Sequence, residues 1–337
     1  MSVRDAVVLA ADVGGTNTKI AIARFDEAGL TPLARRVYAS QSYAAFDDVV
    51  STFLAEGDVL PFAHELAAGC FAVAGPVEQG AARLTNLTWL IDESALARRF
   101  LLPQVRVIND FAAVGLAIDH VSQPDLLTLQ AGAPVARAHR VVVGAGTGLG
   151  VAWLTWNEDR YWVHPSEGGH ADFAPVDAIQ DELLAYLRGR FGRVSCERIL
   201  SGRGLKSIFD FLLDRAGAQA GEVFASALQI GDPAGVVADF ALANRDALAV
   251  QALDIFSSAY GAFAGNMALT ALAHGGVYIA GGIAPKISAK LADGTFIRAF
   301  TAKGRFSALL QTIPVYVVMN DQVGLLGALA EAARIAQ

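Results

Sequence analysis

The sequence predicts a protein of the α/β class built from two related domains. Short segments rich in Val and Ile, with Gly, Asn or Asp at their ends, alternate with helical stretches along the chain. Two hairpins of similar sequence, each with a glycine-containing turn, lie near the N-terminus and near the middle of the chain. A length of 337 residues also fits about two domains of ordinary size.

The predicted elements follow from local pattern. Eight short apolar segments bounded by turn residues are expected to be strands: Val7 to Ala10, Lys19 to Phe25, Phe71 to Ala74, Val105 to Ile108, Val141 to Val143, Val151 to Thr155, Val277 to Ala280 and Val315 to Val318. Asp92 is expected to cap a helix that runs to Phe100. Spacings of three and four predict one helical face made of Leu253, Phe256, Tyr260, Phe263 and Met267.

Each of the two hairpins turns through glycine followed by threonine, at Gly15-Thr16 and at Gly146-Thr147. Glycine leaves backbone N–H groups uncovered, so an anion such as a phosphate approaches closely. The alternative is an ordinary tight hairpin turn, which also favours glycine. Asp12, at the end of the first strand, suits Mg²⁺ beside phosphate, or else caps the turn through the backbone.

Other nucleotide-binding patterns are missing. No G-x-x-x-x-G-K-[ST] segment occurs, and Gly144, Gly146, Gly148 and Gly150 recur at every second residue and lead into a predicted strand. A P-loop and a dinucleotide-binding unit are therefore disfavoured. The sequence still allows a nucleotide site in which the turns of β-hairpins bind the phosphates.

Three further places carry polar side chains suited to a sugar. Asn109 and Asp110 follow a predicted buried strand, where Asp110 can accept a hydroxyl proton, although an Asx helix cap is equally expected there. Glu167 and His170 flank two glycines, which favours hydrogen bonds to a polyol over a metal site with His164 and Asp172. Glu197 is explained by itself as a first-turn residue of a helix capped by Ser195.

Composition restricts the function classes. With 54% hydrophobic and 18% charged residues, the chain is neither disordered, collagen-like nor a coiled coil. A net charge of −7 argues against nucleic acid or an anionic membrane as the main partner. Cys70 and Cys196 are expected to be buried free thiols. The uncharged stretch from Ile255 to Pro285 is interpreted as a buried helix and strand of a soluble cytoplasmic protein without a signal peptide.

Taken in order, seven motifs resemble the bacterial glucokinase family over the whole chain. They are Ala11-Asp12-Val13-Gly14-Gly15-Thr16-Asn17, Thr85-Asn86-Leu87-Thr88-Trp89, Ile108-Asn109-Asp110-Phe111, Gly144-Ala145-Gly146-Thr147-Gly148-Leu149-Gly150, Glu167-Gly168-Gly169-His170, Glu197-Arg198-Ile199-Leu200-Ser201-Gly202 and Ala280-Gly281-Gly282-Ile283. Ala11 and Arg203 depart from some members, which carry Gly and Pro there.

The resemblance implies a two-domain actin-like ATPase (ribonuclease H-like) fold with a sugar and ATP cleft between the domains. The small domain is expected at 1–112 plus 320–337 and the large one at 113–319. The implied reaction is phosphorylation of the 6-hydroxyl of glucose by ATP with Mg²⁺, in a cytoplasmic enzyme that commonly forms a homodimer. Domain closure is expected to expel water from the reaction.

The resemblance also implies a role for each matched residue. Asp110 matches the base that takes the sugar proton. The residues matched to the other hydroxyls are Asn109, Glu167, His170 and Glu197. The first phosphate hairpin is matched by Asp12 (also the Mg²⁺ neighbour), Val13, Gly14, Gly15 and Thr16, the second by Gly146, Thr147 and Gly148, and the adenosine-side turn by Gly281 and Gly282. A kinase for another hexose, a non-catalytic sugar sensor and an actin-like or chaperone-type ATPase remain open alternatives.

Overall fold

The computed structural model describes residues 5–84 and 87–337, and the chain divides into two compact units. The first comprises Met1–Val121 and Gln322–Gln337, and the second comprises Ser122–Asp321. Each unit has a hydrophobic core of its own, which is the property that defines an independent domain. Thr85 and Asn86, which belong to one of the family motifs, lie outside the described residues.

The first unit contains a five-stranded sheet in the order β3-β2-β1-β4-β7. Its strands are β1 (Ala6–Val13), β2 (Asn17–Asp26), β3 (Gly29–Ala39), β4 (Leu66–Val73) and β7 (Gln104–Asn109), and a small second sheet pairs β5 (Ala81–Arg83) with β6 (Leu90–Asp92). The pairs β1–β2 and β2–β3 are antiparallel, whereas β4 and β7 run parallel to β1. The carboxyl ends of β1, β4 and β7 therefore share one edge of the sheet.

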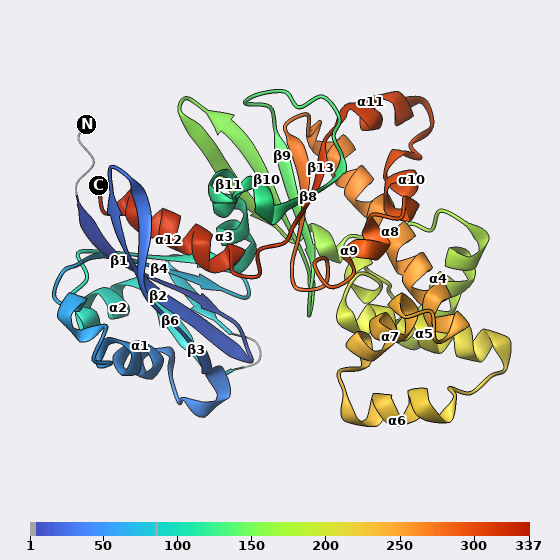
Figure 1. Ribbon diagram of the computed structural model, residues 1–337, viewed down its shortest axis with the longest axis horizontal. Coiled ribbons are helices and arrows are strands. Elements are labelled where there is room, and N and C mark those ends of the chain that lie inside the picture. Colours follow the sequence, from blue (N-terminus) through green and yellow to red (C-terminus); the bar gives the residue numbers. More distant parts are fainter. Residues whose placement is uncertain (1–4, 85–86) are drawn as a thin grey trace. The chain divides into compact units, whose positions relative to one another are not determined.

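Helices cover both faces of this sheet (Figure 1). They are α1 (Phe46–Leu54), α2 (Glu93–Phe100), α3 (Asp110–Ala117) and α12 (Val323–Ile335). α12 and α3 lie on one face and α1 and α2 on the other. Alternation along β1 divides its side chains between the faces, so that Val7, Leu9 and Val13 join the core that contains Phe46. Asp92 caps α2 by accepting a hydrogen bond from the N–H of Ala95 at 2.8 Å, which confirms that prediction.

The second unit repeats the strand arrangement of the first. Its sheet has the order β11-β10-β9-β12-β13-β8. The strands are β8 (Leu126–Gln130), β9 (Arg140–Ala145), β10 (Leu149–Asn157), β11 (Arg160–Ser166), β12 (Gly276–Ala280) and β13 (Val315–Val318). β9, β10 and β11 are antiparallel, and β12 and β13 continue parallel to β9, as β4 and β7 do beside β1. The prediction of two related domains from the hairpins is confirmed at the level of topology, with β8 added at one edge.

Helices of the second unit build its larger core. They are α4 (Ala178–Phe191), α5 (Gly202–Ala216), α6 (Glu222–Ile230), α7 (Pro233–Leu242), α8 (Ala247–Ala271), α9 (Ser288–Leu291), α10 (Thr295–Thr301) and α11 (Ser307–Thr312). α8 is the one helix, among the described residues, that is long and apolar enough to cross a membrane. However, 67% of its most apolar window is buried within the protein, as expected for a core helix. The expected face from Leu253 to Phe263 is buried, and Met267 packs at its margin.

Each of the eight strands expected from the sequence overlaps an observed strand, with Ala74 one residue beyond the end of β4, and the strands that were missed are peripheral. β3, β8 and β11 are edge strands, and β5 and β6 form a separate two-stranded sheet. Edge strands carry polar residues and proline because one side faces solvent, so they lack the Val-rich and Ile-rich signal. Pro32 in β3 and Pro165 in β11 are examples.

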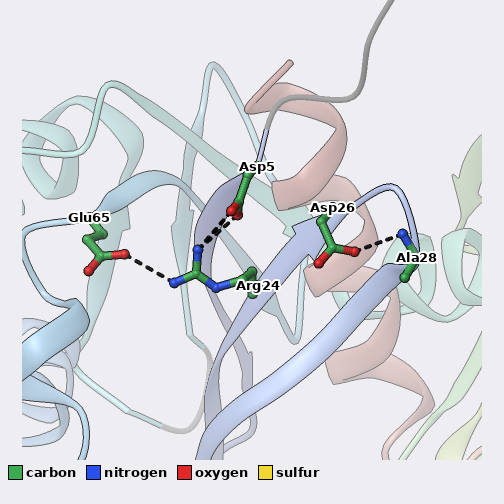
Figure 2. Close-up of polar contacts among 5 residues, drawn as sticks. All are labelled: Asp5, Arg24, Asp26, Ala28 and Glu65. Carbon is green, nitrogen blue, oxygen red and sulfur yellow. Dashed lines mark hydrogen bonds and ion pairs between the residues drawn. The ribbon is translucent and has the colours of Figure 1, made fainter.

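Exposed ion pairs link the strands of the first sheet at the end that lies away from the Gly14–Thr16 turn (Figure 2). The guanidinium of Arg24 contacts Asp5 at 2.9 Å and Glu65 at 3.3 Å, and so links the residue before β1 with β2 and the residue before β4. Beside it, Asp26 closes the β2–β3 turn by accepting from the N–H of Ala28 at 2.8 Å. Exposed pairs of this kind contribute little stability, because water screens the charges.

Candidate active site

The first hairpin turns sharply between β1 and β2. The N–H of Gly14 donates to the carbonyl of Asn17 at 3.0 Å, and the last rung of the ladder joins Val13 to Thr18. A Cβ at position 14 would lie 3.0 Å from that same carbonyl oxygen, so a side chain there is crowded. Glycine is therefore favoured at position 14, and an anion can approach the turn apex at the partly exposed Gly15 and the exposed Thr16.

Two buried hydroxyls hold this turn from behind. Ser40, directly after β3, donates its hydroxyl to the carbonyl of Gly14 at 2.8 Å and its N–H to the carbonyl of Thr16 at 2.8 Å. The hydroxyl of Thr18 lies 3.0 Å from that of Ser40, and both residues are fully buried. Because the Ser40 hydroxyl donates its proton to the Gly14 carbonyl, Thr18 is the donor in the bond between the two hydroxyls. Nothing in the sequence pattern pointed to either residue.

Asp12 is the last residue but one of β1, next to the turn, and is half-buried. Burial raises the pKa of its carboxyl, and the nearby Lys19 opposes that shift. Gly324, in the first turn of α12, faces the carboxylate, and a Cβ there would lie 3.1 Å from its Oδ2. The absent side chain at Gly324 leaves room for the carboxylate beside the start of α12, although burial still disfavours its ionised form when no cation is bound. A half-buried carboxylate at the mouth of a phosphate turn is the kind of ligand that Mg²⁺ accepts.

Asn109 and Asp110 occupy the junction of β7 and α3. The amide oxygen of Asn109 caps the helix by accepting from the N–H groups of Phe111 at 2.9 Å and Ala112 at 3.1 Å. Its Nδ2 donates to the carbonyl of Gly75 at 3.1 Å. The expected Asx cap is therefore present. One N–H of the amide makes no hydrogen bond to any described residue and remains for a ligand.

Asp110 is the first residue of α3, and its Oδ1 accepts from the N–H of Phe111 at 2.9 Å. The position of α3 is set from the other side by α12. A Cβ at Gly327 of α12 would overlap the carbonyl oxygen of Ala113, so only glycine allows this close helix packing. The strand end, the cap and the close packing together fix the direction of the Asp110 backbone.

The second hairpin joins β9 to β10 through Gly146, Thr147 and Gly148. The N–H of Gly146 donates to the carbonyl of Gly148 at 2.8 Å, and the N–H of Gly202 at the start of α5 donates to the carbonyl of Gly146 at 2.9 Å. Gly146 has open space where a Cβ would be, so its backbone is accessible. This turn is therefore fixed by a helix start, whereas hydroxyls fix the first turn.

Ala145, the last residue of β9, is held by groups from two other elements. Its N–H donates to the hydroxyl of the fully buried Tyr260 in α8 at 3.0 Å, and its carbonyl accepts from the N–H of Ile283 at 3.2 Å. Gly281 reaches the same carbonyl with a φ of +84°, and a Cβ there would lie 2.5 Å from it. The Gly281-Gly282 turn is thus packed directly against the base of the second hairpin.

The Glu167-Gly168-Gly169-His170 segment forms a single turn of 3-10 helix after β11. Gly169 is buried, and a Cβ there would overlap the carbonyl oxygen of Leu149 at the start of β10. The side chains of Glu167 and His170 are 73% and 56% exposed, and Oε2 of one lies 3.8 Å from Nε2 of the other. They therefore converge as predicted and are accessible to a ligand.

A short antiparallel pairing brings Glu197 to this segment. The N–H of Cys196 donates to the carbonyl of Ala171 at 2.8 Å, and that of Phe173 to the carbonyl of Val194 at 3.0 Å. Arg193 adds a hydrogen bond of 2.7 Å to the carbonyl of His170. The predicted sugar residues of the second unit are therefore held on one continuous frame.

The helical explanation of Glu197 is wrong in one respect. Residues Cys196–Arg198 form only one 3-10 turn, and the side chain of Ser195 makes no capping bond. The long helix α5 begins at Gly202, and Ser201 caps it by accepting from the N–H of Gly204 at 3.1 Å. Glu197 instead accepts a hydrogen bond at its Oε2 from the N–H of Leu149 at 3.0 Å.

A cavity of about 380 Å³ lies against the other side of the second hairpin, wholly within the second unit. Its lining includes Gly146, Thr147, Arg203, Asp232, Gly282 and Lys286. The volume falls in the range of small-molecule sites. Sequence reasoning missed Asp232 and Lys286. The Asp232-Pro233 pair was a usable signal, because it marks the start of α7.

The described parts of the chain include the residues of the alternative metal site and both cysteines. No group of three His, Cys, Asp or Glu residues capable of holding a metal occurs there. His164 is instead 2.9 Å from the hydroxyl of Thr155. Both cysteines are buried as predicted, and burial raises the pKa of Cys196 to about 12 and that of Cys70 well above its usual value.

Comparisons with known proteins agree on one family. A family model described as Glucokinase matches residues 9–335. The chain is 42% identical to the glucokinase of Nostoc sp. over 343 residues, which covers 98% of this chain and 99% of that protein. The crystal structure of glucokinase from an Antarctic psychrotroph matches with a TM-score of 0.83 at 30% identity, covering 98% of this chain and 100% of that one. A ROK family glucokinase from Streptomyces griseus in complex with glucose and AMPPNP shares the fold, with a TM-score of 0.64 at 20% identity and coverage of 98% and 100%.

Proposed function

Since the chain belongs to the glucokinase family, we propose that it transfers the terminal phosphoryl group of ATP to the 6-hydroxyl of glucose. The observation that carries this proposal is the placement of the second hairpin. Gly146 and Thr147 line the cavity on one side, and Leu149 contacts Glu197 and Gly169 on the other. A phosphate turn that lies between a nucleotide-sized cavity and a polyol-binding loop is the arrangement that sugar phosphorylation needs.

ATP is assigned to the cavity and the hairpin turns. We place adenosine in the cavity beside Gly281 and Gly282, and the phosphates against the turn of Gly146, Thr147 and Gly148, at the N–H groups of Thr147 and Gly148, since the N–H of Gly146 is bonded to the Gly148 carbonyl. Gly14, Gly15 and Thr16 form the second anchoring turn, with Val13 preceding them. Asp12 is the residue we assign to Mg²⁺, which supplies charge neutralisation on the phosphates when it is bound. The carboxylate beside Gly324 fits that ion.

The sugar is assigned to residues of both units. Asn109 keeps one amide hydrogen for a hydroxyl, and Glu167, His170 and Glu197 present polar groups on a common frame. Asp110 is the proposed base, which orients the 6-hydroxyl and takes its proton. Phosphoryl transfer depends mainly on positioning and charge neutralisation, so an ordinary ionised carboxylate is sufficient for this role.

The family resemblance gives domain limits at 1–112 plus 320–337 and at 113–319. A break after residue 112 would divide α3, so we propose that the first break follows α3. From the resemblance alone, we also propose a homodimer and a cytoplasmic enzyme. Limited proteolysis followed by mass spectrometry tests the domain limits, and light scattering coupled to size exclusion tests the dimer. Compaction of the chain with glucose, measured by small-angle X-ray scattering, tests the proposed domain closure.

The first experiment measures ADP formation from Mg-ATP with and without glucose, for the wild type and for Asp110→Asn. We expect glucose-dependent turnover that falls about 100-fold or more in the variant. Asp26→Asn is the matched control, because Asp26 makes the same kind of bond to a backbone N–H at a distant turn (Figure 2). A rate of ADP formation that is the same with and without glucose, and with every other hexose tested, would overturn the kinase assignment.

A further inference from the structure

Glu197 contacts the phosphate hairpin directly, although the family resemblance assigns it to the sugar. Its Oε2 accepts from the N–H of Leu149 at 3.0 Å, the residue that follows the Gly146–Gly148 turn. A Cβ at Gly148 would lie 2.6 Å from the same Oε2, so the carboxylate lies tightly against the turn itself. Its Oε1 makes no hydrogen bond to any residue that the structure describes.

The sheet explains why Leu149 needs such a partner. Leu149 pairs with Ala145, and the polar backbone groups of Ala145 point away from β10 to Tyr260 and Ile283. In an antiparallel pair of this kind the backbone groups of both residues point outward. The Leu149 N–H therefore points towards β11, but the pairing with β11 begins only at Val151. Glu197 fills the place of the missing strand.

The bond is of a strong type. A carboxylate that accepts from a backbone N–H is a charge-assisted hydrogen bond, about twice as strong as a neutral one. Glu197 is half-buried, which reduces screening by water. Loss of this bond leaves Leu149, the first residue after the turn, without its partner. The turn itself carries the N–H groups that are assigned to phosphate. Glu197 is therefore one of the groups that hold the turn, together with the Gly146–Gly148 hydrogen bond and the start of α5.

We propose that Glu197 couples sugar binding to nucleotide binding: one carboxylate oxygen holds the Leu149 N–H and thereby the phosphate turn, while the other receives a sugar hydroxyl. The proposal rests on the proposed function for the identity of the sugar. A hydroxyl bonded to Oε1 fixes the carboxylate, so the Leu149 bond is made in a larger fraction of molecules. Glucose then raises the affinity for ADP, and by linkage ADP raises the affinity for glucose by the same factor.

Glu167 provides a matched control. It is the other glutamate assigned to the sugar, and its contact is with His170 and not with the hairpin. Glu167→Ala and Glu197→Ala therefore remove the same carboxylate and one sugar contact each. Only Glu197→Ala removes the bond to Leu149.

The experiment is calorimetric titration of the full chain with Mg-ADP, without sugar and with saturating glucose. Without sugar, we expect Glu197→Ala to bind ADP about tenfold more weakly than the wild type, and Glu167→Ala to bind it equally well. Saturating glucose is expected to tighten ADP binding about fivefold or more in the wild type and in Glu167→Ala, and to leave it unchanged in Glu197→Ala.

Amide hydrogen exchange at Leu149 gives a readout that does not depend on activity. We expect faster exchange in Glu197→Ala and slower exchange in the wild type when glucose is present. Glu197→Gln keeps an oxygen that accepts from Leu149, so it should retain the sugar-free ADP affinity within about twofold, which guards against a folding defect in the alanine variant.

Unchanged sugar-free ADP affinity in Glu197→Ala, or tightening of ADP binding by glucose to the same measurable extent in that variant and in the wild type, would overturn the coupling. A failure of the proposed function has a different signature. Glucose would then leave ADP binding unchanged in the wild type and in both alanine variants. The Leu149 exchange rate and the sugar-free ADP affinity would still differ between Glu197→Ala and the wild type.

Discussion

The two phosphate hairpins share their strand arrangement but differ in what holds the turn. In the first, the buried hydroxyl of Ser40 holds the Gly14 carbonyl, and the buried hydroxyl of Thr18 donates to that of Ser40. In the second, the carboxylate of Glu197 and the start of α5 hold Leu149 and Gly146. A repeated fold therefore does not imply a repeated set of supporting contacts.

The difference has a functional consequence. The hydroxyls behind the first turn are fully buried, so no ligand reaches them. Glu197 behind the second turn is half-buried and is itself assigned to the sugar. We therefore expect the first hairpin to behave as a fixed anchor and the second to respond to substrate.

Asp12→Asn gives the largest expected effect, at the first hairpin. We expect kcat/KM for ATP to fall about 100- to 1,000-fold, as when one group that stabilises transition-state charge is removed. The same variant should be more stable than the wild type at neutral pH. Folding raises the Asp12 pKa above 3.8, so the folded state prefers the proton and pays for the ionised form. That cost is fully present above the raised pKa and absent below 3.8.

Urea unfolding in EDTA between pH 4 and pH 7 measures this gain, which should shrink as the pH falls. Asp58→Asn is the control of opposite sign, because the hydrogen bond from Arg36 lowers the Asp58 pKa. That exposed carboxylate stabilises the fold above its unfolded pKa and stops doing so as the pH falls through its lowered value. Equal stability of Asp12→Asn and the wild type at pH 7 would contradict the account of Asp12.

Gly169→Ala should damage the second hairpin next most strongly. The new Cβ overlaps the carbonyl oxygen of Leu149, so either the loop or the start of β10 must move. A displacement of this kind typically costs about 100-fold in catalysis and about 1–3 kcal/mol of stability. Steady-state kinetics with glucose and ATP varied in turn are the measurement.

Gly189→Ala in α4 is the control for Gly169→Ala. Its Cβ meets nothing within 4 Å, so the variant should keep full activity and gain about 0.5–1 kcal/mol from helix propensity. If Gly169→Ala matches the wild type in the KM for both substrates, Leu149 does not link the sugar loop to the hairpin.

Sequence reasoning predicted the two hairpins and the central strands because apolar strand cores and glycine turns leave a local signal. Asn109 was equally expected to cap a helix, and it does. Ser40 gave no signal, because one serine at a strand end looks like any other until the fold buries it against Gly14. The bond from Leu149 to Glu197 joins residues far apart in the chain, so only the fold reveals it.

Ser40→Ala tests the fixed anchor with a smaller expected effect. It leaves the buried Gly14 carbonyl without its hydroxyl donor, a loss of about 1–3 kcal/mol. We expect the KM for ATP to rise about tenfold while the KM for glucose changes little. Ser51→Ala is the matched control, since its hydroxyl bonds only to the carbonyl of Asp47 within α1. A larger rise in the KM for glucose than in that for ATP would argue against the assignment of this turn to phosphate.

Thr18→Val is expected to have the smallest effect. It keeps the shape of the side chain and removes the donor to Ser40, but Ser40 still donates to Gly14. The cost is therefore one neutral hydrogen bond, about 1 kcal/mol, and a two- to fivefold rise in the KM for ATP. Thr18→Ser keeps the hydroxyl and should restore the KM even if the lost methyl group lowers the melting temperature. A Thr18→Val defect as large as that of Ser40→Ala would mean that the two hydroxyls act as one unit, and that the anchor fails as a whole when either is lost.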